Sequence, residues 1–393
     1  MGRSVIVAGA RTPIGKFRGA LAPLSAVELG GRTIRAAVDR ARIAREQVEY
    51  TIFGHVLQAG QGQITSLQAS IGGGLPKEVP AITLNKVCLS GMSAIAMADQ
   101  MIRAGEIEVA VAGGMESMTN APYALPKARD GSRLGDADLI DTMIHDGLWS
   151  SFRDHHMGEG TDEVSAELGL TREEQDAWAA RSHQRAHAAW EAGILAEEVV
   201  PVEVPKPRGA TVTVDRDEGI RPDTTPEKLA ALKPAFRPEG MITAGNASQI
   251  SDGACAVVVM SEEKAEELRV EPLAEIVAYG MSSDRYPSLH TVPALALERA
   301  LKKAGLAASD LELLEINEAF AAVPIHSARM LGVDEAIVNV HGGAVALGHP
   351  IGASGARIVL TLAMEMRRRG SGLGGSAICG GGGQGDALVL RRS

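Results

Sequence analysis

The chain has 393 residues, enough for two or three domains with a core that can hold an enzyme active site, so a peptide hormone or a lone binding module is excluded. Apolar residues make up 45% of the chain and charged residues 22%, which is the composition of a folded globular protein and not of a disordered one. With 39 Lys and Arg against 49 Asp and Glu, the net charge is −10, which has the wrong sign for general nucleic-acid binding.

The first predicted element is a strand. The apolar run at residues 5–9 ends in glycine and is too short for the core of a signal peptide. Charge-free stretches such as 51–76 are interrupted by Gly, Gln, His and Pro, so they cannot supply the roughly 20 apolar residues that cross a bilayer. Three cysteines are an odd number for a disulfide framework and are typical of a reducing compartment. We therefore expect a cytoplasmic protein without a membrane segment.

The strongest organisational signal is an internal repeat. Residues 37–53 can be aligned with residues 300–316, because each stretch has a charged helix end, a short link and then a strand. The helix that begins at Ser90, followed by the strand EVAVAGG, recurs at Ser354, followed by SAICGGGG. The two offsets, 263 and 264 residues, are nearly equal. The chain is therefore predicted to contain two related halves.

A third pair of matching strands indicates an insertion in the first half. ACAVVVM from Ala254 corresponds to ALVL from Ala387 at an offset of only 133 residues, which leaves about 131 extra residues in the first half. This inserted lobe is predicted to hold a helix over 171–193, whose TREE start has capping-box spacing, and the β-branched runs VVPVEV and TVTV. Because strands alternate with helices, the predicted fold class is α/β, with parallel sheets covered by helices in both halves.

Cys88 is the first candidate for chemistry. It follows the strand AITL and precedes a helix, where backbone N–H groups and the helix dipole are expected to stabilise a thiolate nucleophile. The alternative is a buried structural cysteine, which this residue taken alone favours. Cys255, within an apolar strand, fits that structural role better and is assigned no chemistry.

Three more candidates lie at loops of the second half. Cys379 precedes GGGG, where bare backbone could approach both the thiol and a substrate; a dinucleotide loop would need a following helix, whereas a strand follows. His349 lies in a loop whose duplicate is within a few residues of Cys88, so a pseudo-twofold axis would bring two thiols and an imidazole together. Asn317 could hold a water or orient the imidazole, or be an exposed cap. A zinc site is the other alternative, although no Cys or His pair has zinc-like short spacing.

Four motifs, NKVCLSG, NEAF, GHPIGASG and CGGGGQG, resemble those of the thiolase family in the same order, and specifically of its acetyl-CoA C-acetyltransferases. VIVAGARTPIGKF and TAGNASQISDGA extend the resemblance over the whole chain. It implies a duplicated thiolase fold, with two βαβαβ-type halves, mixed sheets and central helices, plus an inserted α/β loop domain. The implied division is an N-terminal half at 1–118 and 249–270, a CoA-binding loop domain at 119–248 and a C-terminal half at 271–393.

The resemblance also implies roles in catalysis. Cys88 would accept the acyl group, His349 would be its base, and Cys379 would be the acid and base for the second substrate. Asn317 would hold a water and form one oxyanion site with His349. The backbone N–H groups of Cys88 and Gly381 would form the other oxyanion site. The implied reaction is the reversible condensation of two acetyl-CoA to acetoacetyl-CoA and CoA through an acyl-cysteine, with no metal or redox cofactor.

Coenzyme A would bind the inserted domain. Arg221 would contact the nucleotide despite the acidic net charge, although taken alone it would be a solvated surface charge. The other implied contacts, with the pantetheine and the acyl group, are Ala244, Ser248, His156, Met157, Phe236 and Phe320. The family is usually homotetrameric, as a dimer of dimers, with acyl-CoA substrates as the only other partners and neither nucleic acid nor membrane.

Two positions depart from the family pattern. His341 stands where many relatives have Asn, and the segment 286–293 lacks the glycine-proline turn that is common in short-chain enzymes. Because this loop borders the acyl pocket in the family, a 3-ketoacyl-CoA thiolase for longer chains remains an alternative. A decarboxylating condensing enzyme would carry His in place of Cys379. A catalytically silent CoA-binding scaffold would not need Cys88, His349 and Cys379 together.

Overall fold

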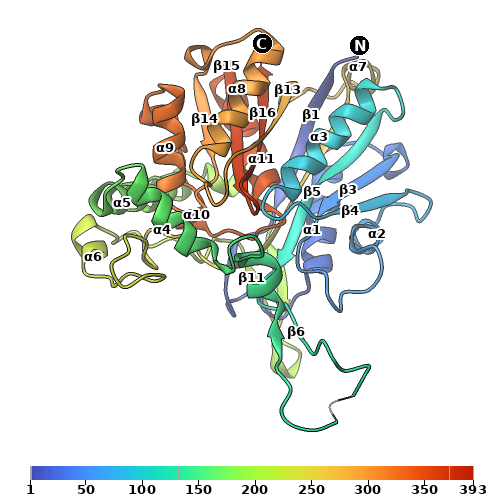
Figure 1. The fold of residues 1–393 in the computed structure, drawn as a ribbon. Helices are drawn as coiled ribbons and strands as arrows, with labels where there is room; N and C mark the ends of the chain where they lie inside the picture. The colour runs from blue at the N-terminus through green and yellow to red at the C-terminus, as the bar shows by residue number, and fades with distance from the viewer. Residues whose placement is uncertain (1, 132, 371, 393) are drawn as a thin grey trace.

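The computed structural model describes residues 2–131, 133–370 and 372–392, apart from the Arg208 side chain. Within these residues ten strands form one continuous sheet (Figure 1). Apart from β4 at the outer edge of the first half, the two halves contribute corresponding strands in the same spatial order, from the edge of the sheet to its centre. In the first half they are β4 Ala81–Leu84, β3 Tyr50–Gly54, β5 Val109–Ser117, β12 Ser251–Ser261 and β1 Ser4–Arg11, with β2 Gly15–Lys16 beside β12. In the second half they are β14 Leu313–Ile316, β15 Gly372–Gly380, β16 Gln384–Arg392 and β13 Ala274–Ser283.

Neighbouring strands are parallel only toward the outer edges of the sheet. β3 is parallel to β4 and to β5, and β14 is parallel to β15, whereas the other described neighbours are antiparallel, including β1 and β13, which join the halves. The prediction of parallel sheets therefore holds only for these outer strand pairs, and the mixed sheets implied by the family resemblance are confirmed. The reason is connectivity, because the short turn at 381–383 between β15 and β16 can only return the chain antiparallel.

The outer helices repeat between the halves as the offsets predicted. The helices α1 Ala26–Ala41 and α2 Thr65–Gly72 cover the first half, and α8 Val292–Ala304 and α9 Ala322–Leu331 cover the second. α1 begins with a capping box in which the Ser25 hydroxyl accepts from the Glu28 backbone N–H. Its buried stripe packs on β1, β12 and β5, which fixes that face of the sheet.

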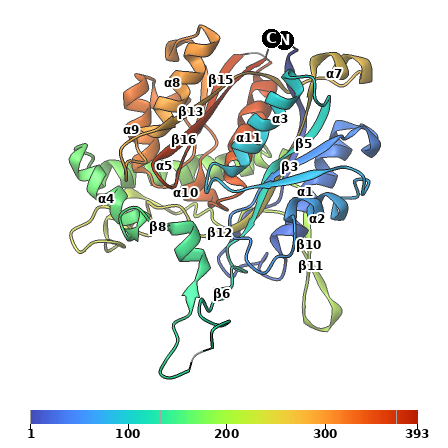
Figure 2. The same cartoon turned by 45° about the vertical axis from the view of Figure 1, so that its right-hand side comes forward.

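Two central helices lie between the halves and contact strands of both (Figure 2). They are α3 Ser90–Arg103 and α11 Ser354–Arg369, which correspond in the repeat. Their first turns pack backbone to backbone: a Cβ at Gly91 would lie 2.9 Å from the Ala356 nitrogen, and one at Gly355 would lie 2.5 Å from the Met92 nitrogen. The loops that lead into these helices, which carry Cys88 and His349, are thereby brought to one place.

The inserted segment packs against both halves. Its longest helix, α5 Arg172–Glu191, starts with the predicted capping box of Thr171 and Glu174, and the two β-branched runs pair as a hairpin. Trp178 packs in the hydrophobic core of the second half. Trp190 packs with Ile14, which follows β1 of the first half. Figures 1 and 2 show the stretch around β6 extending away from the body. Its elements are β6 Tyr123–Ala124, β7 Ile140–Asp141, β8 Trp149–Ser150, β9 His155–His156, α4 Met157–Glu167, α5, β10 Val202–Pro205, β11 Thr211–Val214 and α6 Pro226–Ala230.

The remaining elements are short connections. They are η1 Arg45–Gln47, the π-helix η2 Met143–Leu148, η3 Leu195–Glu197, η4 Pro207–Gly209, α7 Glu262–Leu268, η5 Ala308–Asp310, η6 Glu335–Ile337 and α10 Ala344–Leu347. In the described part of the chain, no helix has both the length and the apolar character needed to cross a membrane.

Candidate active site

Cys88 lies in the short turn between β4 and α3, with only 3% of its surface exposed. The preceding residue, Val87, has φ = 50°, a left-handed conformation that is strained for a β-branched side chain. Ser90 holds this turn: its hydroxyl donates to the Val87 carbonyl at 2.6 Å and accepts from the Lys86 N–H at 2.8 Å. The strained turn places the thiol at the start of α3, inside the protein.

The Cys88 thiol is protonated in the resting protein. Burial, and then the neighbouring charge of Glu116, raises the pKa of Cys88 to about 12. The expected stabilisation by backbone N–H groups is present, because the Cys88 N–H lowers this pKa, but loss of hydration outweighs it. A nearby base must take the thiol proton before this sulfur can attack.

His349 is oriented as that base. Its Nδ1 lies 2.6 Å from the Ser354 hydroxyl, which itself donates to the Pro350 carbonyl at 3.0 Å. Since the hydroxyl proton is committed to the carbonyl, Nδ1 carries the imidazole proton and donates it to Ser354. Burial, and then the charge of Arg357, lowers the pKa of His349 to about 3. The ring is therefore neutral, and its Nε2 carries the lone pair that can accept a proton.

Asn317 lies directly beyond this lone pair. Its Nδ2 is 3.4 Å from His349 Nε2, and its Oδ1 accepts from the Arg357 guanidinium at 3.5 Å. The side chain is fully buried, so the alternative of an exposed cap is wrong. Asn317 thus contacts Nε2 itself, although it is not among the side chains that line the chamber around the thiols.

The two thiols and the imidazole border one small chamber of about 40 Å³. Cys379, near the end of β15, is 1% exposed, and burial followed by the proximity of Cys88 raises the pKa of its thiol. The predicted meeting of Cys88, His349 and Cys379 is thus what the fold produces. The chamber is lined by Cys88, Leu148, His156, Met157, Ser248, Leu289, Ala319, Phe320, His349, Ile351, Cys379 and Gly380.

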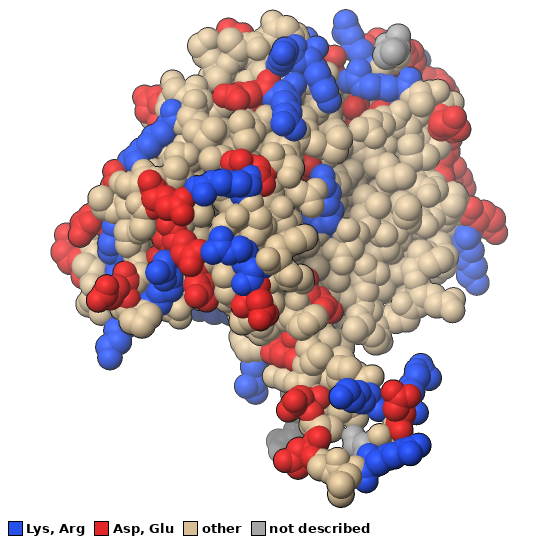
Figure 3. All heavy atoms as spheres, in the orientation of Figure 1, with Lys and Arg blue, Asp and Glu red and all other residues tan. Residues whose placement is uncertain are grey.

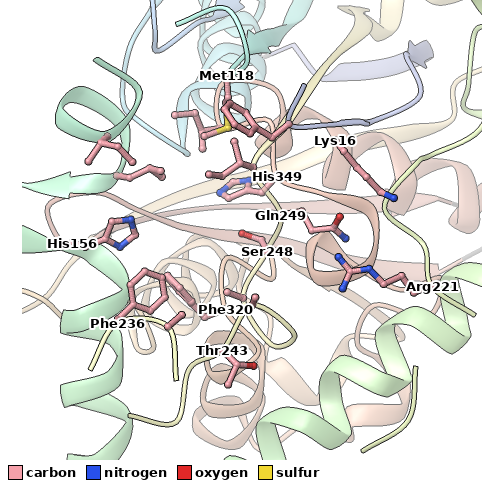
Figure 4. A pocket seen from close by; sticks show the side chains of 18 residues that line it. Lys16, Met118, His156, Arg221, Phe236, Thr243, Ser248, Gln249, Phe320 and His349 are labelled. Carbon is pink, nitrogen blue, oxygen red and sulfur yellow. The ribbon is translucent and has the colours of Figure 1, made fainter. Parts of the chain in front are cut away.

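A larger cavity of about 460 Å³ leads from the surface to this chamber and shares His349 and Ser248 with it. Figure 4 shows Lys16 and Arg221 at one side of this cavity, with His349 nearer to its middle. In the part of the chain that the structure describes, neither cation forms an ion pair. The walls between are largely apolar, with Ala244, Ala247 and Ile250 on one turn-rich segment before β12. The cavity can therefore take a long ligand with an anionic outer end.

Aromatic side chains close the cavity opposite the two cations (Figure 4). His156 stacks on Phe236 with ring centroids 4.6 Å apart, and Phe236 meets Phe320 edge to face at 6.2 Å. The His156 ring also caps α4, because its Nδ1 accepts from the Gly158 N–H at 3.0 Å. Met157 follows at the chamber wall.

One predicted site residue lies outside the chamber, and two residues that line the cavities were not predicted from the sequence. Gly381 lines a separate surface pocket beside Val87, while its neighbour Gly380 lines the chamber. Lys16 stands within a quoted motif, but nothing local shows that its side chain reaches the cavity. Leu289, from the atypical loop 286–293, lines the chamber. Among the described residues no group of three or more His, Cys, Asp or Glu side chains is placed to hold a metal ion.

Comparison with known proteins finds similarity over nearly the whole length of the chain. Residues 4–263 match the thiolase N-terminal domain and residues 270–392 match the thiolase C-terminal domain. A probable acetyl-CoA acetyltransferase of Mycolicibacterium smegmatis is 54% identical over 388 residues, covering 99% of this chain and 100% of that protein. An acetyl-CoA acetyltransferase of Pseudomonas aeruginosa is 50% identical and covers 99% of each chain. The crystal structure of the Bacillus anthracis acetyl-CoA acetyltransferase has a TM-score of 0.97 at 41% identity, covering 100% of this chain and 99% of that one.

Proposed function

The chain belongs to the thiolase family, and we propose that it is an acetyl-CoA acetyltransferase, which condenses two acetyl-CoA to acetoacetyl-CoA and CoA and catalyses the reverse thiolysis. The observation that carries the proposal is one buried chamber that is bordered by Cys88, Cys379 and the neutral imidazole of His349. A silent CoA-binding scaffold would not need these three groups to meet out of water.

The first half of the reaction acylates Cys88. His349 Nε2 takes the thiol proton, and the sulfur attacks the acetyl carbonyl of the first acetyl-CoA. The carbonyl oxygen becomes an oxyanion, for which the backbone N–H groups of Cys88 and Gly381 are the proposed donors. The departing CoA thiolate takes a proton from Cys379. Cys379 is then a thiolate, balanced by the imidazolium of His349.

The second half forms the carbon–carbon bond. The Cys379 thiolate removes an α-proton from a second acetyl-CoA, and the enolate oxygen accepts from the protonated His349 Nε2 and from a water held by Asn317. The enolate carbon attacks the acetyl group on Cys88, whose sulfur leaves and recovers its proton from His349. All protons and acyl groups are accounted for by the chain and CoA, so no metal or redox cofactor is proposed.

The cavity also supports the proposed substrate. Lys16 and Arg221 suit the phosphates of CoA, and the apolar stretch through Ala244 and Ser248 suits the pantetheine arm. The chamber of about 40 Å³ is closed by Met157, Phe320 and other apolar side chains, which favours an acetyl group over a long acyl chain. Specificity for short chains is proposed on this ground.

The thiol assignment is tested by intact-protein mass spectrometry after incubation with acetyl-CoA. Cys88→Ser should form no acetyl-enzyme, and both directions should stop, because no thiolate accepts the acyl group. Cys379→Ser should still accumulate acetyl on Cys88, while condensation falls by several orders of magnitude, since a hydroxyl is too weak a base for the α-proton. An adduct on Cys379, or full condensation by Cys379→Ser, would contradict the roles. Preferred cleavage of a ten-carbon ketoacyl-CoA over acetoacetyl-CoA would contradict the short-chain proposal.

We further propose a homotetramer in a reducing cytoplasm. β4 ends the described sheet with an open edge, and the face around β3 and β4 carries few charged side chains (Figure 3). Tyr123, Leu125 and Leu139 are exposed on the stretch that extends from the body, which is typical of a contact with other copies. All three cysteines are free, as a reducing compartment would keep them. Sedimentation velocity at micromolar concentration measures the assembly.

A further inference from the structure

An ion pair with a fully buried carboxylate connects the two segments that carry the thiols. Lys86, two residues before Cys88, places its Nζ 2.7 Å from the Asp386 carboxylate on β16. Asp386 has no exposed surface and also accepts from the Ser93 hydroxyl of α3 at 2.5 Å. The proposed reaction assigns no step to these side chains.

Asp386 is also tied to the Cys379 strand by the sheet itself. β16 pairs with β15 so that Asp386 lies opposite Ile378, the residue before Cys379. One carboxylate therefore contacts the Cys88 turn through Lys86, the central helix through Ser93, and the Cys379 strand through the backbone ladder.

The same two segments touch where the oxyanion donors lie. A Cβ on Gly381 would lie 3.2 Å from Val87 Cγ2, and one on Gly380 would lie 2.6 Å from Leu89 Cγ. Val87 is the strained residue of the turn, and such a conformation persists only where flanking contacts determine it. Lys86 provides the flanking contact on the N-terminal side, because its Nζ is anchored by Asp386 and its N–H by Ser90.

We propose that Lys86 and Asp386 are positioning residues, which hold the strained Cys88 turn against the Cys379 strand and so fix the distance between the two thiols. Only the expected effect of these residues on turnover rests on the proposed function. The effect on Cys88 itself is independent of the reaction, because any electrophile must approach the same sulfur.

The test uses the full chain with Lys86→Met, Asp386→Asn and Lys86→Arg. It measures the alkylation rate of Cys88 by iodoacetamide and the rate of acetyl-enzyme formation from acetyl-CoA. We expect Lys86→Met and Asp386→Asn each to slow both rates by about tenfold to a hundredfold, since small misplacements of reacting groups cost that much. Lys86→Arg, which keeps the charge, should restore most of the rate.

The two variants separate positioning from simple electrostatics, because they remove charges of opposite sign. Loss of the cation at 86 would disfavour the Cys88 thiolate, whereas loss of the anion at 386 would favour it, so rate changes in opposite directions would overturn the proposal. The matched control is Arg103→Met at the far end of α3, which breaks a pair with Asp99 at 2.6 Å in which the cation is equally exposed. Equal slowing by this control would also overturn it.

A second variant keeps the test decisive should Asp386→Asn not fold. Ser93→Ala removes one hydrogen bond to Asp386 and no charge, and is expected to slow acetylation severalfold at unchanged KM. Unchanged rates in both Ser93→Ala and Lys86→Met would contradict the role. A parent protein that alkylates normally but forms no acetyl-enzyme would contradict the proposed function alone.

Discussion

The thiol and the imidazole of this site are both uncharged at neutral pH. Burial raises the pKa of Cys88 to about 12 and lowers the pKa of His349 to about 3, so an ion pair between them is not the resting state. Charge separation becomes favourable only when a substrate carbonyl can take up the negative charge. Burial of this kind keeps the thiol in its less reactive protonated form until a bound thioester can take up the charge.

Lys16 and Arg221 are predicted to share the recognition of CoA phosphates. Arg221→Ala and Lys16→Ala should each raise the KM for acetyl-CoA by about three- to tenfold with little change in kcat, since exposed charge-assisted contacts are modest and act before chemistry. The KM should also depend less on salt than in the parent. Initial rates between low and high ionic strength measure both effects.

The matched control for these cations is Arg216→Ala. This exposed arginine of the same inserted segment pairs with Glu191 at 2.9 Å and does not line the cavity. The KM of Arg216→Ala for acetyl-CoA should equal that of the parent at every salt concentration. An unaltered salt dependence in Arg221→Ala would place that side chain on the solvated surface without a role in binding.

At the scale of elements, the site depends on how closely the two central helices meet. Gly91 and Gly355 occupy equivalent positions in α3 and α11, and each packs against the backbone of the other helix. Because backbone cannot rotate away as a side chain can, a methyl group here must push the helices apart. The same displacement would separate the Cys88 turn from the His349 loop.

Gly91→Ala is accordingly predicted to destabilise the protein by about 1–3 kcal/mol, although alanine is the better helix former, because overpacking outweighs propensity. Gly72→Ala in α2 is the control, since a Cβ there meets nothing within 4 Å, and it should be neutral or stabilising by up to about 1 kcal/mol. Urea unfolding of both variants measures the difference. A stabilising Gly91→Ala would show that the helices can separate at no cost.

At the scale of the whole molecule, buried carboxyls set how stability varies with pH. Burial raises the pKa of Glu116 and of Glu315 to about 8, well above the value of about 4.3 for an unfolded glutamate. Between these values the folded protein binds more protons than the unfolded chain, so stability falls as pH rises toward 8. Between pH 7 and 8 the urea midpoint should therefore decrease.

Glu116→Gln removes one of these two groups and should reduce the slope between pH 7 and 8, whatever its effect on absolute stability. The histidines with lowered pKa, such as His290 and His349, oppose this slope weakly, because an unfolded histidine with a pKa of about 6.5 is still about one quarter protonated at pH 7, and their contribution fades toward pH 8. The control is Glu312→Gln, which removes an exposed carboxylate and should leave the slope unchanged. A midpoint that rises with pH in the parent would refute this prediction.

The sequence by itself determined the repeat, the capped start of the helix at Thr171 and the meeting of the two thiols with the imidazole. Each of these is written in local patterns: the equal offsets at Ser90 and Ser354, the capping box at Thr171, and motifs that place Cys88 and His349 before corresponding helices. The two halves carry the same local pattern, so they fold alike and pack symmetrically. The contact between the halves was therefore predictable from the repeat as well.

Only the tertiary structure decided the sheet pairing, the state of the thiol and the identity of the second cation. Antiparallel pairing of β5 with β12 depends on how 131 or so inserted residues return, which no local signal records. The protonation of Cys88 follows from desolvation by distant segments, and Lys16 matters because folding leaves it without an ion-pair partner beside Arg221 in the described chain. These properties depend on contacts between residues hundreds of positions apart, and a pattern of neighbours along the chain does not carry them.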